Sequence, residues 1–173
     1  MERKTKLVNQ SRTIMTEMIM PNDTNPLGSL MGGVLMRWMD IAAGICAGKH
    51  CEAHVVTASV DHVSFKHPIN LGEIITLESC VTRAFNTSVE VYVEVFVNNF
   101  EGKPRVKSNH AYFTMVALDH DSKTPRPAPL VAPETDEEFR LYEGANRRRE
   151  MRLVLSGRMN IEDAVDIKSL FKG

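Results

Sequence analysis

Asp40 is the residue of this 173-residue chain that packing alone explains least. It stands in the middle of the most apolar segment, from Gly33 to about Lys49, which contains no proline and is typical of a buried helix of roughly four turns. An ionised carboxylate is costly in apolar surroundings unless it is paired. In a partly apolar cleft it can instead serve as a general base or a nucleophile. Asp40 is therefore either a catalytic group or a capped side chain that faces solvent.

Gly32 and Gly33 stand at the start of the same helix, where alanine would be more stabilising. Glycines at this position let a ligand come close to the free amide groups of the helix N-terminus. These amides carry partial positive charge and can hold a developing oxyanion. The stretch thus either combines oxyanion donors with a carboxylate or is a plain helix that begins with glycines.

The composition argues for an ordinary globular protein. The apolar content is 43% and the formal net charge is -1, so no charge imbalance points to nucleic acid. The apolar segment is interrupted by Arg37 and Asp40 and is too short to span a bilayer. Three cysteines without metal-ligand spacing, and no signal peptide, indicate reduced thiols. We therefore expect a cytoplasmic protein with no metal and no nucleic-acid or membrane partner.

The pattern of hydrophobic residues predicts an α+β domain. One strand precedes the helix, and four long strands joined by short turns follow it. The expected strands are Ser11–Met20, His54–Phe65, Glu73–Ala84, Ser88–Val97 and Arg105–Leu118. A twisted antiparallel sheet with the long helix lying across it would bury both the helix and one sheet face.

The two ends of the chain differ from this domain in composition. Residues 1–12 are polar and basic and predict a frayed arm, so the domain is expected to cover residues 12–121. Four prolines make 122–134 an extended linker. Residues 135–173 form a helical extension, in which Thr135 and Glu138 resemble a capping box.

Several short motifs together resemble a known family. They are Asp23-Thr24-Asn25-Pro26-Leu27-Gly28, Gly32-Gly33, Met39-Asp40, and Val55 to Asp61 with Phe65. With the strand order, they are similar to the hotdog-fold acyl-CoA thioesterases over about residues 12–119. The nearest branch contains brain acyl-CoA hydrolase and the small bacterial acyl-CoA thioesterases. The resemblance implies hydrolysis of acyl-CoA, with coenzyme A as part of the substrate and product and no cofactor.

The same resemblance implies roles for two residues and an assembly. Asp40 matches the family's catalytic carboxylate, and Asn25 matches a second catalytic residue contributed across a dimer interface. Helix geometry agrees, because Gly33 and Asp40 lie on one face but about 10 Å apart, too far to serve one carbonyl. An antiparallel second copy would bring Asp40 near Gly32, Gly33 and Asn25 of its partner. We expect a homodimer at minimum, and the family often forms a trimer of dimers.

Other polar residues have weaker claims to the site. Arg83, Asn86, Thr87 and Ser88 lie at a strand–turn–strand junction where the resemblance implies contacts with the nucleotide end of coenzyme A; an ordinary polar hairpin is the alternative. Thr57 and Ser59 either line the pantetheine tunnel or form one polar strand face.

Two other functions remain open alternatives. A hotdog hydratase or dehydratase pairs a histidine with a carboxylate around the helix start, and the segment from Asn25 to Asp40 contains no histidine. A non-catalytic acyl-CoA sensor would need a DNA-binding segment, for which residues 1–12 are too short, and would leave Asp40 without a purpose. Hydrolysis of acyl-CoA is therefore the function that we expect.

Overall fold

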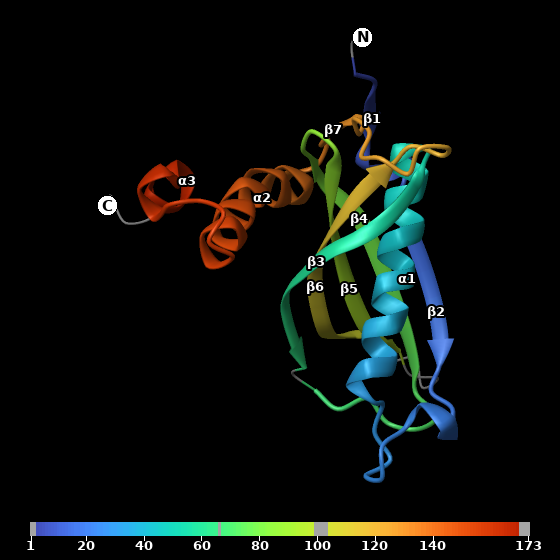
Figure 1. The fold of residues 1–173 in the computed structure, drawn as a ribbon. Coiled ribbons are helices and arrows are strands. Elements are labelled where there is room, and N and C mark those ends of the chain that lie inside the picture. Colours follow the sequence, from blue (N-terminus) through green and yellow to red (C-terminus); the bar gives the residue numbers. More distant parts are fainter. Residues whose placement is uncertain (1–2, 66, 99–103, 170–173) are drawn as a thin grey trace. The chain divides into compact units, whose positions relative to one another are not determined.

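The computed structural model describes residues 3–65, 67–98 and 104–169 of the chain. The chain divides into two compact units, Met1–Ala132 and Pro133–Gly173. Figure 1 shows the elements of both units in the order of the sequence. Within the described residues, no helix has the length and apolar character needed to cross a membrane.

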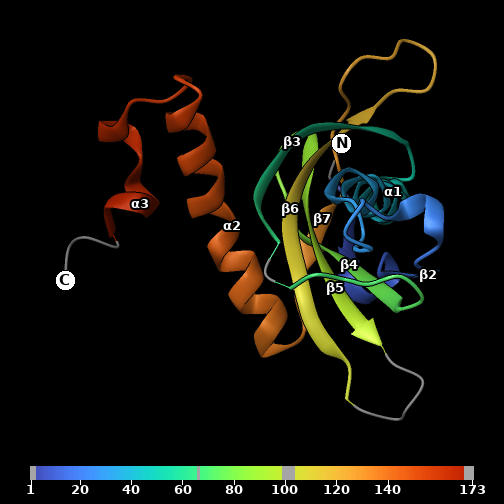
Figure 2. The ribbon, with the colours of Figure 1, turned by 90° about the horizontal axis from the view of Figure 1, so that it is seen from below.

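The first unit is built on one long helix and a five-stranded antiparallel sheet. The helix α1 spans Gly32–Cys51, and the strands are β2 (Thr13–Met18), β3 (His54–Phe65), β4 (Ile74–Ala84), β5 (Ser88–Asn98) and β6 (Val106–Leu118). Their order in the sheet is β2-β4-β5-β6-β3, so the first strand after the helix lies at one edge. Figure 2, in which α1 is seen nearly end-on, shows the strands curving round one side of the helix. The predicted α+β architecture is confirmed.

The core lies between α1 and the inner face of the sheet. Alternate valines of β5, including Val91 and Val93, are fully buried, as the period-two pattern predicts. From the helix side, Met39 and Ala43 are also fully buried. Each large apolar side chain buried in this way contributes about 1.5–3 kcal/mol. The small residues of α1 let the helix lie close to the sheet, and this packing fixes its position.

The N-terminal arm is not frayed as its composition suggests. The strand β1 (Thr5–Leu7) pairs in parallel with β7 (Leu130–Ala132), which lies inside the segment expected as a linker. A 3-10 helix, Val8–Gln10, follows β1, and its Val8 is only 1% exposed. The prediction was wrong because the partner strand is more than 120 residues away, and local composition cannot show it.

Shorter elements complete the chain. A second 3-10 helix, Pro21–Asp23, precedes the loop that leads into α1. The second unit contains α2 (Asp136–Leu155), a 3-10 helix at Ile161–Asp163, and α3 (Val165–Ser169). The predicted capping box at the start of α2 is confirmed, because the Glu138 amide donates to Thr135 Oγ1 at 3.2 Å and the Glu138 carboxylate accepts from the Thr135 amide. Residues 170–173 of the expected extension lie outside the described residues.

Candidate active site

Asp40 projects from α1 and is held by a residue of the neighbouring strand. Its side chain is exposed in the protomer, and its Oδ1 accepts a hydrogen bond of 2.5 Å from the Thr57 hydroxyl. Thr57 lies on β3 beside an irregularity in the pairing with β6, between Thr57 and Ser59. The hydroxyl fixes one carboxylate oxygen, which leaves the other oxygen able to accept a proton from water.

A groove runs from Asp40 along α1 towards the C-terminal end of the helix. We call it the Asp40 groove; its volume is about 450 Å³, and its lining includes Gly44, Gly48, His54 and Met115. The two glycines follow Asp40 at intervals of four residues, so they lie on the same face of the helix. A Cβ at Gly44 would be 3.8 Å from the terminal methyl of Met115, so glycine keeps this part of the groove wide.

Asn25 is fixed by the loop before α1. Its Oδ1 accepts hydrogen bonds from the amides of Leu27, at 2.9 Å, and Ser29, at 3.2 Å. These two bonds identify which side-chain atom is the oxygen and commit it to the loop. The Asn25 NH₂ group donates no hydrogen bond to the part of the chain that the structure describes, so it can donate to a ligand.

Gly32 and Gly33 form the first turn of α1, which begins one residue earlier than predicted. Met31, the residue before the helix, makes no side-chain capping bond, and its carbonyl accepts from the amides of Val34 and Leu35. The amides of Gly32 and Gly33 donate to no described residue, and a Cβ at Gly33 would meet no atom within 4 Å. The helix therefore begins with two open donors on a surface that a ligand can approach.

The residues predicted for one site lie in two separate hollows of the protomer. Gly32 and Asn25 line a pocket of about 420 Å³ together with Ile69 and Asn109. Asp40 lies in the Asp40 groove instead, about 10 Å along the helix from Gly33. A single chain therefore does not bring the carboxylate and the amide donors to one carbonyl group.

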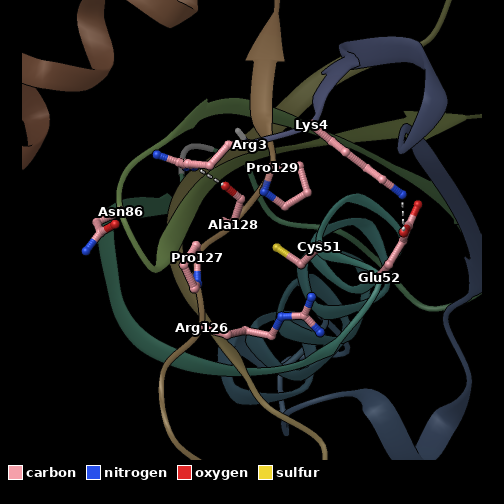
Figure 3. A pocket seen from close by; sticks show the side chains of 9 residues that line it. All are labelled: Arg3, Lys4, Cys51, Glu52, Asn86, Arg126, Pro127, Ala128 and Pro129. Carbon is pink, nitrogen blue, oxygen red and sulfur yellow. Dashed lines mark hydrogen bonds and ion pairs between the residues drawn. The ribbon is translucent and has the colours of Figure 1, made fainter. Parts of the chain in front are cut away.

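The other predicted binding residues occupy different places. Ser59 follows Thr57 on β3, and its buried hydroxyl has no hydrogen-bond partner among the described residues. Arg83 is half-buried on β4. Asn86, Thr87 and Ser88 form the turn into β5, where the Asn86 carbonyl accepts from the amide of Ala128 at 3.0 Å. None of these three residues lines the Asp40 groove, and the exposed side chain of Asn86 lines a third hollow together with Arg3 and Arg126 (Figure 3).

The cysteines belong to the packing. Burial raises the pKa of Cys46 and of Cys51 to about 11, so both thiols stay protonated near neutral pH. Among the described residues, no three histidine, cysteine or acidic side chains are grouped so that they could hold a metal ion.

Several residues that shape these hollows are not predictable from the motifs of the sequence. Gly44 and Gly48 could have been found from their spacing, because they follow Asp40 at successive intervals of four residues on the same helix. For Met115, the sequence shows only that it lies on a strand with alternating apolar residues. Arg126, from the proline-rich segment, has no such signal, because its place depends on a contact with β6: its amide donates to the Ala117 carbonyl at 2.9 Å.

Known proteins resemble this chain over most of its length. The sequence model of the thioesterase superfamily matches residues 27–99. YkhA of Bacillus subtilis, described as an uncharacterized acyl-CoA thioester hydrolase, is 39% identical over 145 residues, covering 84% of each chain. A solved apo-hexameric acyl-CoA thioesterase has a TM-score of 0.85 at 42% identity and covers 88% of this chain and 97% of its own.

An acyl-CoA hydrolase from Staphylococcus aureus is also similar. Its complex with butyryl coenzyme A, coenzyme A and coenzyme A disulfide has a TM-score of 0.84 at 34% identity, covering 97% of this chain and 99% of its own. Three variants of that enzyme replace an asparagine, an aspartate and a threonine by alanine. In that enzyme the aspartate stands 15 positions after the asparagine, and the threonine stands 17 positions after the aspartate. The same spacing relates Asn25, Asp40 and Thr57 in this chain.

The fold and these similarities define a hotdog-fold protein of the thioesterase superfamily. Within it, the chain belongs to the acyl-CoA thioester hydrolases and is an enzyme of that class.

Proposed function

We propose that this protein hydrolyses acyl-CoA to a free fatty acid and coenzyme A, with Asp40 as the catalytic carboxylate. The observation that carries the proposal is the exposed Asp40 carboxylate, held by Thr57 in the Asp40 groove, whose volume is about 450 Å³. The names of the similar proteins and the coenzyme A complexes of the Staphylococcus aureus hydrolase support the choice of substrate.

The proposed reaction needs only groups that this chain supplies. Water attacks the thioester carbonyl carbon while Asp40 takes one proton from the water. The amides of Gly32 and Gly33 hold the oxygen that becomes negative. The carbon–sulfur bond then breaks, and the coenzyme A thiolate leaves and receives a proton. Direct attack by Asp40 through an anhydride is the alternative route to the same products.

Asn25 takes part as a hydrogen-bond donor in this proposal. Its oxygen is used by the loop, so only its NH₂ group can face the substrate. A donor at this point orients the substrate carbonyl or the attacking water.

We further propose that each site is shared between two subunits. Asp40 and Asn25 lie in separate hollows of one protomer, and two isoleucines of α1 near Asp40 are exposed. Ile41 and Ile45, which line the Asp40 groove, are 39% and 44% exposed. A second copy packed antiparallel against α1 would cover them and place its own Asn25 and Gly33 opposite Asp40. The hexameric thioesterase among the similar structures supports an assembly of three such dimers.

Release of free thiol from a panel of short, medium and long acyl-CoA thioesters tests the activity. We expect turnover without added metal or nucleotide, and the chain-length preference follows from the panel. Binding of acyl-CoA without thiol release on any member would contradict the proposal and favour the sensor.

A further inference from the structure

Met115 lies next to the contact between Thr57 and Asp40. It stands on β6, pairs with Thr57 across the β3–β6 ladder and is only 2% exposed. Its Sδ lies 3.5 Å from the Thr57 Oγ1, which is within hydrogen-bonding distance for a sulfur acceptor. The same side chain forms part of the lining of the Asp40 groove. The Thr57 hydroxyl is therefore held between two acceptors, the Asp40 carboxylate on α1 and the Met115 thioether on β6.

The ladder beside Thr57 is interrupted. Thr57 pairs with Met115 and Ser59 pairs with Thr114, so β3 holds one residue more than β6 at this point, and Ala58 has no counterpart on β6. Such a bulge bends the strand and leaves the extra residue outside the regular pairing. Thr57 and Met115 form the last regular pair on their side of the bulge. Side-chain contacts therefore gain weight, relative to the backbone ladder, in setting the orientation of Thr57.

The helix confines the Met115 side chain from the other side. A Cβ at Gly44 would be 3.8 Å from the terminal methyl of Met115, so this methyl rests against the face of α1. A methionine side chain has three rotatable bonds and adopts many shapes when it is not confined. Here its sulfur has Thr57 as a neighbour and its methyl has Gly44. The thioether thus has a defined place beside the Thr57 hydroxyl.

The rotamer of Thr57 decides between two groups of similar size. A threonine carries a hydroxyl and a methyl on its Cβ, and a staggered step about χ1 moves one into the place of the other. In this structure the hydroxyl lies between Asp40 and Met115. A polarizable sulfur with lone pairs favours the hydroxyl at this place, whereas a hydrocarbon neighbour favours the methyl. The side chain at position 115 therefore influences which of the two groups faces Asp40.

We infer that Met115 is a positioning residue for the proposed reaction, because its thioether selects the Thr57 rotamer that aims the hydroxyl at Asp40. The inference rests on the proposed function and deepens it, since Met115 acts on the catalytic carboxylate only through Thr57. Met115→Leu keeps nearly the same volume in the core but removes the sulfur acceptor. In that variant the Thr57 methyl would turn towards Asp40 in part of the molecules, and the carboxylate would lose its hydrogen bond there.

Double-mutant kinetics in the full-length enzyme test this inference. We expect Met115→Leu to lower kcat about threefold at an unchanged KM and melting temperature, because only part of the molecules lose the hydrogen bond. Thr57→Val has no hydroxyl left to aim, so Met115→Leu should cause no further loss of kcat in that background. Met39→Leu, the same change at another fully buried methionine, is the matched control and should leave kcat unchanged.

The Thr57 rotamer gives a second readout that does not depend on turnover. Crystal structures distinguish the rotamers, because the two heavy atoms on Cβ occupy different staggered positions in each. The wild type should show the hydroxyl at Asp40, and Met115→Leu should show a mixture of two rotamers.

Two results would overturn the inference. One is an unchanged Thr57 rotamer in Met115→Leu. The other is an equal fold loss of kcat from Met115→Leu with and without the Thr57 hydroxyl. A wild type without turnover on any acyl-CoA would instead remove the proposed function, while the rotamer comparison would still decide whether Met115 orients Thr57.

Discussion

The contact between Thr57 and Asp40 fixes the orientation of the carboxylate that we propose as the catalytic base. A free aspartate rotates about its side-chain bonds, whereas one oxygen of Asp40 is tied to β3 by the Thr57 hydroxyl. This hydrogen bond leaves the second carboxylate oxygen, Oδ2, pointing in a defined direction in the Asp40 groove. Catalysis by a general base depends on such geometry as much as on the pKa of the base.

Substitutions of Asp40 and Thr57 distinguish the role of the proposed base, Asp40, from that of the hydroxyl that orients it, Thr57. Asp40→Asn should lower kcat about 10³-fold with the fold intact, because the amide cannot take a proton. Thr57→Val keeps the shape but loses the hydroxyl, and we expect a loss of about tenfold in kcat. Thr57→Ser, which keeps a hydroxyl, is the control and should stay near wild type. Near-wild-type kcat in Asp40→Asn would rule out its proposed role.

Asn25 allows its two hydrogen-bonding functions to be tested apart. Asn25→Asp keeps the oxygen that accepts from Leu27 and Ser29 but loses the NH₂ donor. It should therefore fold with an unchanged melting temperature and show a lower kcat. Asn25→Ala loses the loop bonds too, so we expect both kcat and the melting temperature to fall. An Asn25→Asp enzyme with full kcat would show that the donor is not used.

At the scale of elements, α1 sets the distances that matter. One helix carries the open amides of Gly32 and Gly33 at its start and Asp40 two turns later, and the Asp40 groove runs from there towards its C-terminal end. Because the helix is rigid, the separations between these points follow from a rise of about 1.5 Å per residue. The separation of about 10 Å between Gly33 and Asp40 is therefore a property of this one element.

The C-terminal end of α1 also gives the protein a pH-dependent stability. His50 is fully buried, and its Nε2 atom lies 3.1 Å from the carbonyl oxygen of Pro129. Burial lowers the pKa of His50 below the ordinary value of 6.5. As the pH falls below 6.5, the unfolded chain takes up a proton that the folded chain does not, and folding loses stability.

Chemical denaturation between pH 5 and pH 8 measures this effect. We expect the free energy of unfolding to fall below about pH 6.5, with a contribution from His50 of at most about 1.4 kcal/mol per pH unit, and no contribution from it above that pH. His50→Gln, which cannot take up a proton, should have a shallower dependence in the acidic range. Identical slopes for the two proteins would show that His50 does not cause the loss.

Elements with a strong local pattern were predictable, and those that depend on distant partners were not. The alternating valines of β5 and the proline-free apolar run of α1 gave boundaries correct to within two residues. The pairing of β1 with β7 had no local signal, because short strands are stabilised by their partner. The Asp40–Thr57 contact depends on how β3 lies against α1, which spacing alone does not show.

At the scale of the molecule, one chain carries two incomplete halves of the proposed site. Asp40 with its groove is one half, and Asn25 with the amides of Gly32 and Gly33 is the other. In the proposed symmetric dimer, each half would meet the complementary half of the partner, so that two complete sites would form together. The central claim is therefore about assembly as well as chemistry.

Subunit complementation tests that claim most directly. Inactive Asp40→Asn and inactive Asn25→Ala are mixed in equal amounts under conditions that allow subunits to exchange, and thiol release is measured. Half of the dimers should be mixed, each with one site that carries both defects and one that carries neither, so about a quarter of wild-type activity should return. Mixing without exchange should restore nothing. No recovery after exchange has been verified by mass spectrometry would contradict the shared site and place both residues in a site within one chain.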